Sequence, residues 1–569
     1  MNGVLILIIG IVALSLGYVF YGQRLSKKWG VDPSRKTPAF EFEDGVDYVP
    51  TDSNVLFGHQ FASIAGAAPI IGPIVASSYG WLPVLLWCLL GGIFFGGVQD
   101  FGSMVASVKN EGHSLGFIIK KYLGSTGKAL FLLFCWLFCI VVIAAFANIV
   151  AVSFGSVANN PTLTLSNGST ATTSCLFIVF AVGLGFFSRK FRPKQSLLTV
   201  IAIILLVVAM TIGLKAPITS LDVHGWSYIV FVYILIASIV PVWSLLQPRD
   251  YLNSFLLIFM IAAAVIGILV AHPTMSLPAV TTFSVGGKGM FPYLFVTIAC
   301  GAVSGFHALV SSNTSSKQIK SEKDMLKVSY GAMLVESLLA VIALVCVGSL
   351  GGMPEGASAQ QTFAMAIANF LDVVNMNHNL SMTLINLAIS AFALTSLDSV
   401  ARIARLSFQE LFTDEDQEAA TVGPIQKLCQ NSVFATVITL VLGYALSKGG
   451  YLNIWALFGS SNQMLSALAL SAVAVYLKKS GKDSKNVWIP MLIMMAVTFS
   501  ALTLLNISNF QTIGTDSFVF AKQGLQLIFG IFIFIIGILI SYNSIKSLFF
   551  SDDESTKTKL QPVLEGELD

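Results

Sequence analysis

Few side chains in this sequence place a reactive group where it could do chemistry, and these side chains lie within long apolar runs. Glu336 is eight residues into the run 328–350, roughly 12 Å from its start at 1.5 Å per helical residue. A carboxyl group that loses its hydration favours the protonated form. Glu336 is therefore a candidate proton carrier, and a hydrogen-bonded packing role is the alternative. Ionisable residues at this depth in a membrane are costly and often functional.

A second group of titratable residues is expected nearer one membrane surface. By their positions along the apolar runs, His59, His307, Asp398 and Arg402 are expected to share one layer. Imidazole titrates near neutral pH, so such a layer could relay or gate protons. Asp398 and Arg402 are four residues apart on one helical face and could form an ion pair. For each histidine, a structural hydrogen bond is the alternative.

Other polar residues are expected to have structural roles. Asp100 and the Arg249–Asp250 pair should lie at helix ends as interfacial anchors or ion pairs. The cluster 460–463 (Ser, Ser, Asn, Gln) lies in the run 451–478 and should form interhelical hydrogen bonds outside the transport core.

The run 57–73 is apolar enough for a bilayer, yet it cannot form one continuous helix. Pro69 and Pro73 lack an N–H group and clash with the preceding turn, and Gly66 permits a sharp bend. Unpaired backbone groups at membrane depth are tolerated only where protein, water or a ligand satisfies them. Broken helices therefore often mark substrate and ion sites. A proline-kinked packing helix is the alternative.

A second apolar run, 226–246, is interrupted by Pro241. It lies five spans after the first broken run, so the two cross the membrane in opposite directions. This is the pattern of an inverted repeat with its site between the two breaks, although Pro241 as an incidental kink is the alternative. The substrate-binding residues predicted on this basis are Ala65, Gly66, Ala67, Ala68, Pro69, Val240, Pro241 and Trp243.

Composition defines the broad class. The chain has 569 residues, of which 55% are hydrophobic and only 11% charged, and its mean hydropathy is +0.80. Apolar runs long enough to cross a bilayer recur along the whole chain, so we expect an all-α polytopic membrane protein. The runs are 3–22, 54–78, 80–98, 128–155, 174–187, 196–214, 226–246, 251–271, 291–312, 328–350, 380–404, 431–447, 451–478, 487–507 and 521–541, which makes about fifteen.

Charge supports this topology. With the N-terminus outside, all but four of the 32 Lys and Arg residues lie on the cytoplasmic side, as the positive-inside rule requires. The C-terminus is then cytoplasmic, and the amphipathic segment 361–374 is a surface or re-entrant helix outside.

The expected units are an N-terminal helix and loop (1–53), an inverted-repeat core (54–404, with halves 54–214 and 226–404), C-terminal helices (405–550) and an acidic tail (551–569). No metal-ligand spacing, phosphate-binding loop or soluble domain is present in the sequence. We therefore expect no enzyme, cofactor, metal site or nucleic-acid partner, and a lipid bilayer as the setting.

Several stretches resemble the carbon starvation protein A (CstA) family. The matching ranges are 57–73, 242–253, 301–307, 317–318, 321–324, 331–336, 395–402 and 455–463. The resemblance implies a bacterial or archaeal inner-membrane transporter of the amino acid–polyamine–organocation type, with a five-plus-five helix core. It also implies uptake of peptides in carbon starvation or, in some members, proton-coupled uptake of pyruvate.

The chain departs from the family pattern at two positions. Gln60 stands where the pattern has a second histidine, and Asn313 stands where it has glycine. The first departure puts a two-histidine relay in doubt. By analogy with the superfamily, Ser311 and Ser312 are candidates for binding a sodium ion.

The sequence therefore predicts a secondary active transporter for small carboxylate-bearing nutrients, with peptides as first choice and a proton as the coupling ion. A proton-coupled pyruvate symporter and a transporter-like nutrient sensor are the alternatives, sodium is the alternative ion, and the oligomeric state is left open. Glu336, His59, His307 and Asp398 are the predicted proton-coupling residues.

We expect Glu336→Gln to abolish pH-driven uptake, because an amide cannot carry a proton, while the protein still folds. Uptake of labelled substrate into membrane vesicles under an imposed pH gradient measures this. Uptake equal to that of the unmodified protein would rule out Glu336 as the proton carrier.

Overall fold

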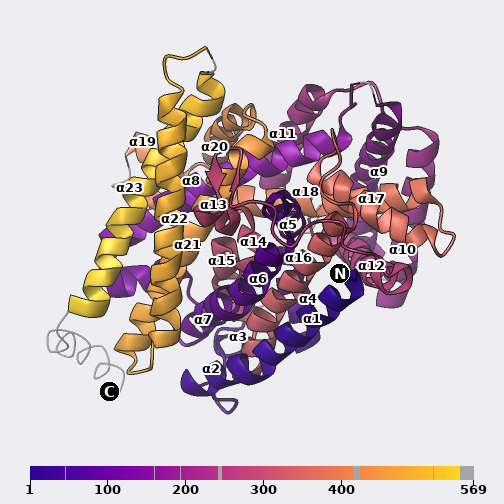
Figure 1. Ribbon diagram of the computed structural model, residues 1–569. Helices are drawn as coiled ribbons and strands as arrows, with labels where there is room; N and C mark the ends of the chain where they lie inside the picture. Colours follow the sequence, from indigo (N-terminus) through magenta and orange to yellow (C-terminus); the bar gives the residue numbers. More distant parts are fainter. Residues whose placement is uncertain are drawn as a thin grey trace.

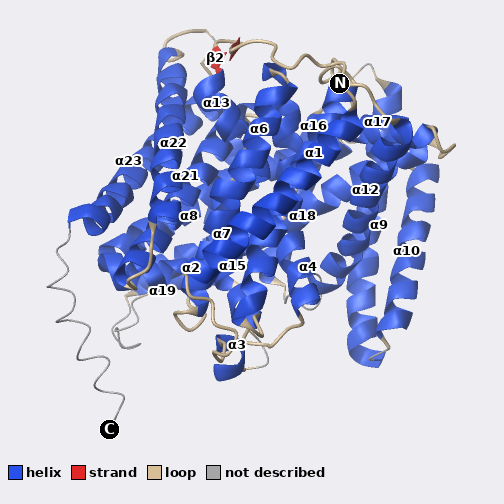
Figure 2. Ribbon diagram, turned by 60° about the horizontal axis from the view of Figure 1, so that its bottom comes forward, coloured by secondary structure: helices blue, strands red, loops and turns tan. Residues whose placement is uncertain are grey.

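The computed structural model describes residues 1–44, 47–158, 160–191, 194–240, 246–413, 423–516 and 518–550. These residues form a bundle of helices, most of which run between two opposite faces of the molecule (Figures 1 and 2). Nine helices in the described part of the chain are long and apolar enough to cross a membrane, or up to eleven if each of two bent pairs counts as one span. An all-helical membrane protein is therefore confirmed, and the count of fifteen remains a prediction.

The first half of the chain contains α1 (Gly3–Leu16), α2 (Gln23–Lys28), α3 (Pro38–Glu41), α4 (Ser53–Ile64), α5 (Ala68–Ala76), α6 (Trp81–Gly91), α7 (Gly97–Val108), α8 (Leu115–Phe154), α9 (Pro161–Phe191), α10 (Gln195–Lys215), α11 (Val223–Ile239) and α12 (Leu246–Ala271). The second half contains β1 (Ser284–Val285), β2 (Lys288–Gly289), α13 (Met290–Thr297), α14 (Ala299–Ala302), α15 (Gly305–Asn313), α16 (Ala332–Ser349), α17 (Ala359–Asp372), α18 (His378–Leu411), α19 (Pro424–Gln430), α20 (Ser432–Ser447), α21 (Tyr451–Lys479), α22 (Lys485–Gln511) and α23 (Leu525–Ile545).

α2 and α3 lie on one face of the bundle (Figure 2), and among the described residues Lys27 and Lys28 of α2 and Lys317 of the segment packed on α3 are found there; we call it the basic face. Its loops are joined by polar contacts: Lys109 Nζ is 2.7 Å from Glu322 Oε1, and the Asp32 N–H donates to Glu322 Oε2 at 2.7 Å. The N-terminus and the β1–β2 hairpin lie at the opposite face (Figure 2).

The first predicted break is confirmed. α4 ends at Ile64 and α5 begins at Ala68, with a bend of 49° between the two helices. Ala65 leaves the helical conformation (φ −73°, ψ 70°), and Pro69 in the first turn of α5 cannot donate the hydrogen bond that would continue α4. A Cβ at Gly66 would lie 2.8 Å from Ser396 Oγ, so glycine lets α18 approach the break.

The break that packs against the first one lies in α13–α15, and the sequence did not predict it. α14 ends at Ala302, Val303 and Ser304 are extended, and α15 begins at Gly305. α14 contacts α5, and α15 contacts α4 and α7. No proline marks this interruption. Gly301 and Gly305 flank it instead, and at Gly305 a Cβ would lie 2.4 Å from Leu465 Cβ, so the bend combines poor helix formers with close contact to α21.

The run 226–246 is also interrupted: α11 ends at Ile239 and the next helix begins at Leu246. Pro241 and Trp243 lie outside the described residues. Val240 is extended and ends α11 (φ −68°, ψ 145°).

Two other expectations need correction. The span 174–187 is found but is too short, because α9 runs from Pro161 to Phe191 and so includes most of the interval 156–173 between two expected spans. There Asn167 is buried and donates to Gly155 O at 2.8 Å, so hydrogen bonding replaces solvent. The segment 361–374 lies largely in α17, which is buried over most of its length and packs on α5, α12, α16 and α18. The surface alternative is therefore wrong, and the re-entrant alternative remains a prediction.

We expect Gly459→Ala to destabilise the protein by about 1–3 kcal/mol, the usual cost of overpacking. The new Cβ would lie 2.0 Å from Val296 O, a backbone atom of α13 that cannot move aside alone. Gly183→Ala is the matched control, since a Cβ at Gly183 would have no atom within 4 Å and alanine favours a helix. Thermal unfolding in detergent compares the two variants. An unchanged melting temperature for Gly459→Ala would show that α13 and α21 separate easily.

Candidate functional site

Three titratable side chains from three helices meet in the interior. Asp100 of α7, His307 of α15 and Glu336 of α16 are each 0% exposed. His307 Nδ1 is 3.3 Å from Asp100 Oδ2, and His307 Nε2 is 3.2 Å from Glu336 Oε2. Both ring nitrogens therefore face a carboxyl group. We call these three residues the carboxylate–histidine cluster.

The cluster is suited to holding and passing a proton. Two buried carboxylates beside one imidazolium have a net negative charge, which a low-dielectric interior penalises. The net charge is zero when the imidazole is charged and one acid is protonated, or when the imidazole is neutral and both acids are protonated. These two states differ only in the position of a proton between neighbouring atoms.

Asp100 is the member that sequence reasoning missed. Its expected place at a helix end is wrong, because α7 continues to Val108 and Asp100 lies roughly 14 Å before Lys109 at 1.5 Å per residue. Gln99 holds the carboxylate in place, since Gln99 Nε2 donates to Asp100 Oδ1 at 3.0 Å and to Ser304 O at 2.6 Å. The available signal was the run of polar residues that continues beyond the apolar span, at positions 99, 100, 103 and 107.

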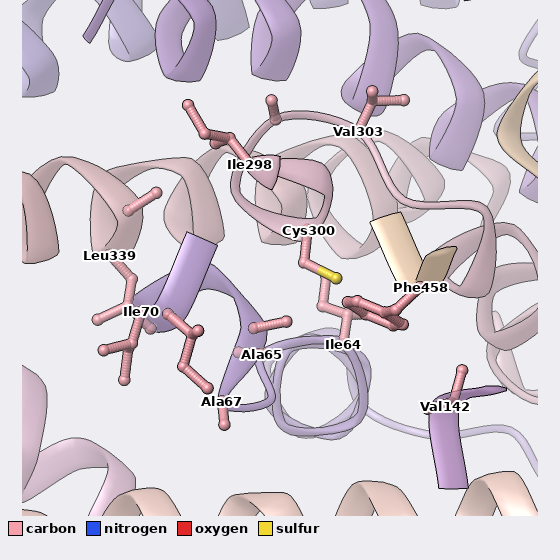
Figure 3. Close-up of a cluster of buried hydrophobic side chains, with 14 of the residues drawn as sticks. Ile64, Ala65, Ala67, Ile70, Val142, Ile298, Cys300, Val303, Leu339 and Phe458 are labelled. Carbon is pink, nitrogen blue, oxygen red and sulfur yellow. The ribbon is translucent and has the colours of Figure 1, made fainter. Parts of the chain in front are cut away.

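A small cavity lies beside His307, at the level of both breaks. The volume open to the centre of a water molecule is about 20 Å³, enough for about one water. Figure 3 shows Cys300 and Phe458 beside Ile64 at the end of α4. The lining residues come from α4 and α5 (Ile64, Gly66, Ala68), α8 (Phe138, Val142, Phe146), α14 and α15 (Cys300, Phe306, His307), α18 (Ser396, Val400) and α21 (Phe458, Asn462).

Two helices begin at this cavity, α5 at Ala68 and α15 at Gly305. Helix N-termini present unpaired N–H groups and a partial positive charge. In this structure N–H groups in the first turn of both helices have acceptors: Ile70 and Ile71 donate to Ala67 O, Phe306 to Asn462 Oδ1 and His307 to Ser304 O. The cavity wall is therefore apolar, and only the partial positive charge of the two helix ends acts near it.

Gln60 connects α4 to two serines that follow His307 in the chain, Ser311 of α15 and Ser315 just beyond the end of α15. Its Nε2 donates to Ser311 Oγ at 2.9 Å, and Ser315 Oγ donates to its Oε1 at 2.6 Å. Ser312 Oγ donates within its own helix to Ala308 O at 2.8 Å. In this structure the Ser311 hydroxyl thus contacts the Gln60 side chain.

The expected layer of His59, His307, Asp398 and Arg402 is not formed. His59 is exposed, whereas its neighbour Gln60 is buried. Successive helical residues differ by about 100° in direction, so a similar depth does not bring side chains to the same face.

Asp398 belongs to a separate buried cluster. It forms an ion pair with Arg249, and the Tyr233 hydroxyl donates to Asp398 Oδ2 at 2.9 Å. The expected place of Arg249 is a helix end, as an interfacial anchor or in an ion pair. It does lie in the first turn of α12 and is ion-paired, but with Asp398 and in the interior, where its side chain is 1% exposed; the Asp250 side chain lies outside the described residues. Arg402 donates to Ala237 O and Val240 O at 2.7 Å, so it binds the carbonyl end of α11.

A larger cavity opens between the cluster region and the basic face. The volume open to water centres there is about 450 Å³. Its walls include Cys135 of α8, Leu309 and Asn313 of α15, and Ser407 of α18. The same three helices also line the small cavity, and we call the larger one the vestibule. Among the described residues, no group of three His, Cys, Asp or Glu side chains is arranged to hold a metal ion.

The apolar helices, the broken pair at the centre and the buried titratable cluster define a multi-pass helical membrane protein. The profile of the family described as "Carbon starvation protein CstA" matches residues 2–353 and 352–501. The chain belongs to this family.

Curated relatives agree with this assignment. The chain is 33% identical to the "Peptide transporter CstA" of Helicobacter pylori over 567 residues, which cover 85% of this chain and 79% of the relative. It is 31% identical to the "Pyruvate/proton symporter BtsT" of Escherichia coli over 572 residues, 83% of this chain and 77% of the relative. A solved manganese transporter from Eremococcus coleocola aligns over 87% of this chain and 94% of its own, with 13% identity and a TM-score of 0.41.

We expect Asp398→Asn and Arg249→Met each to destabilise the protein by about 3–5 kcal/mol, because each removes the oppositely charged partner of a buried ion. The double variant should lose less than the sum of the two single losses. Thermal or denaturant unfolding in detergent measures the three variants. Losses that simply add would show that the two side chains are not coupled.

Proposed function

We propose that this chain is a secondary active transporter that imports small carboxylate-bearing nutrients, peptides first, together with protons. The observation that carries this proposal is the fully buried Asp100–His307–Glu336 cluster, whose histidine also lines the cavity between two broken helices. The relatives named as peptide transporters and as a pyruvate/proton symporter support the same class of function. The proposal needs no chemical step on the substrate.

The proposed substrate site lies between Ala65–Pro69 and the break at 303–304. A carboxylate there meets the N-terminal ends of α5 and α15, which favour negative charge. The other half of the predicted site rests on Val240, Pro241 and Trp243. The Arg402 side chain donates to the Val240 carbonyl. A substrate-binding role for Val240, Pro241 and Trp243 remains a prediction.

Coupling follows from charge balance in a low-dielectric site. A substrate carboxylate bound near His307 adds a negative charge beside the cluster, so binding of a proton to the cluster becomes more favourable. Linkage makes the effect reciprocal, and a protonated cluster binds the anion more tightly. A carrier in which each ligand strengthens the binding of the other moves both together, which is symport. Asp398 is held in its own ion pair and His59 is exposed, so their predicted part in coupling has less structural support.

Pyruvate is the second candidate substrate. The cavity has room for about one water, so a three-carbon acid needs a smaller rearrangement of its phenylalanine walls than a dipeptide does. The relative named as a pyruvate/proton symporter supports this alternative.

We further propose a bacterial inner-membrane location with about fifteen spans, an outer N-terminus and a cytoplasmic C-terminus. The Lys residues on the basic face support this orientation. The vestibule then opens to the cytoplasm and is the release route. Sodium, with Ser311 and Ser312 as ligands, remains the alternative coupling ion.

Uptake into proteoliposomes tests the proposal. Labelled pyruvate and labelled dialanine are supplied separately under an inward proton gradient. We expect one of them to accumulate and the accumulation to collapse with a protonophore. Accumulation driven by a sodium gradient alone would show that sodium, and not the proton, is the coupling ion. Accumulation of neither solute under either gradient would favour the nutrient sensor.

We expect Asp100→Asn to lose proton-driven accumulation and to retain exchange of labelled for unlabelled substrate across the membrane. The amide keeps the size of the carboxyl but cannot take part in proton exchange with His307. Asp516→Asn is the matched control, because Asp516 is exposed. Full proton-driven accumulation by Asp100→Asn would remove this residue from the coupling mechanism.

A further inference from the structure

The polar cluster 460–463 of α21 does more than join helices at a distance from the site. Asn462 and Gln463 both bind the interrupted segment α13–α15. Gln463 Nε2 donates to Phe295 O at 2.7 Å, and Trp455 Nε1 donates to Thr297 O at 3.0 Å. α21 therefore packs alongside the interrupted segment α13–α15, and both border the small cavity.

Asn462 lies at the break itself and is 0% exposed. Its Oδ1 accepts the Phe306 N–H at 3.2 Å, a backbone donor in the first turn of α15. Its Nδ2 lies 3.0 Å from Ser304 Oγ and 3.3 Å from Cys300 Sγ. Because the Phe306 N–H requires an acceptor, the side-chain oxygen of Asn462 must point at Phe306. The N–H₂ group then points at Ser304 Oγ and Cys300 Sγ.

Asn462 also lines the small cavity, as do Cys300 and Phe306. The close approach of α21 to α15 depends on Gly305, where a Cβ would lie 2.6 Å from the backbone carbonyl oxygen of Asn462. The Asn462 side chain is thus held at both ends: its oxygen accepts from Phe306, and its N–H₂ group donates to Ser304 Oγ and to the sulfur of Cys300, a weak acceptor that also lines the cavity.

We propose that Asn462 is a substrate-binding residue: when substrate binds, its N–H₂ group exchanges the weak acceptor Cys300 Sγ for the substrate carboxylate, while its side-chain oxygen holds the first turn of α15. This inference rests on the proposed import of a carboxylate. It places α21, outside the ten-helix core expected from the sequence, in the wall of the transport site.

The chemistry distinguishes asparagine from aspartate at this position. An aspartate has the same shape and still accepts the Phe306 N–H, but it replaces the donor with an oxygen. When ionised it repels an anionic substrate and adds a third carboxylate near His307. When protonated it regains a donor, so its effect depends on pH, whereas a purely structural defect does not.

The test uses the full chain with pyruvate and dialanine as probes, first for uptake and then for binding in detergent. We expect Asn462→Asp to raise KM about tenfold or more, the size of a lost hydrogen bond to a charged group, with a smaller change in maximal rate. Binding should recover in part between pH 7.5 and pH 5.5. Ser461→Ala is the matched control, since the Ser461 hydroxyl donates to Leu457 O of its own helix.

Asn462→Ser is a second variant in case the aspartate prevents folding. Its neutral hydroxyl can donate and accept, but the side chain is shorter and cannot reach both Phe306 and the substrate, so we expect a raised KM without recovery at low pH. If the unmodified protein concentrates either probe and both Asn462 variants match its KM, this inference is wrong and the proposed function stands. If the unmodified protein concentrates neither probe, both are wrong.

Discussion

Two carboxyl groups and an imidazole are buried together in the interior of this protein, and the helices around them are arranged so that they meet. Removing Asp100, Glu336 or His307 from water is unfavourable for each alone. Together they can reach a net-neutral state, with each ring nitrogen within 3.3 Å of a carboxyl oxygen. Three helices must meet at one point for this to occur, and α15 can reach that point only because the helix before it is interrupted.

The two interruptions are stabilised in different ways. At Ala65–Ala67 the sequence itself prevents a continuous helix, because Pro69 follows directly. At Val303–Ser304 the surroundings stabilise the bend: Gly305 fits against α21, Asn462 accepts the Phe306 N–H, and Gln99 donates to Ser304 O. Backbone groups at the second break thus find partners on α7 and α21, and those at the first break find them locally, since Gly66 donates to Ile64 O and Ile70 to Ala67 O.

The contrast explains how much could be predicted from the sequence. Composition and apolar runs predicted the fold class, and proline chemistry predicted the first break. Depth within an apolar run identified Glu336, and the family resemblance supported His307. Sequence could not assign direction around a helix axis, so exposed His59 was grouped with buried residues while Gln60 was the one facing inward. Asp100 and the Arg249–Asp398 pair depend on contacts between helices far apart in the chain, which local patterns do not record.

The central claim is that binding of the substrate anion and of a proton to the carboxylate–histidine cluster are coupled. The most direct measurement follows the pH of a weakly buffered solution of the purified protein while pyruvate or dialanine is added, with binding recorded in parallel. We predict uptake of protons in proportion to bound substrate and a smaller uptake in Glu336→Gln. Saturable binding with no change in proton content would contradict the account.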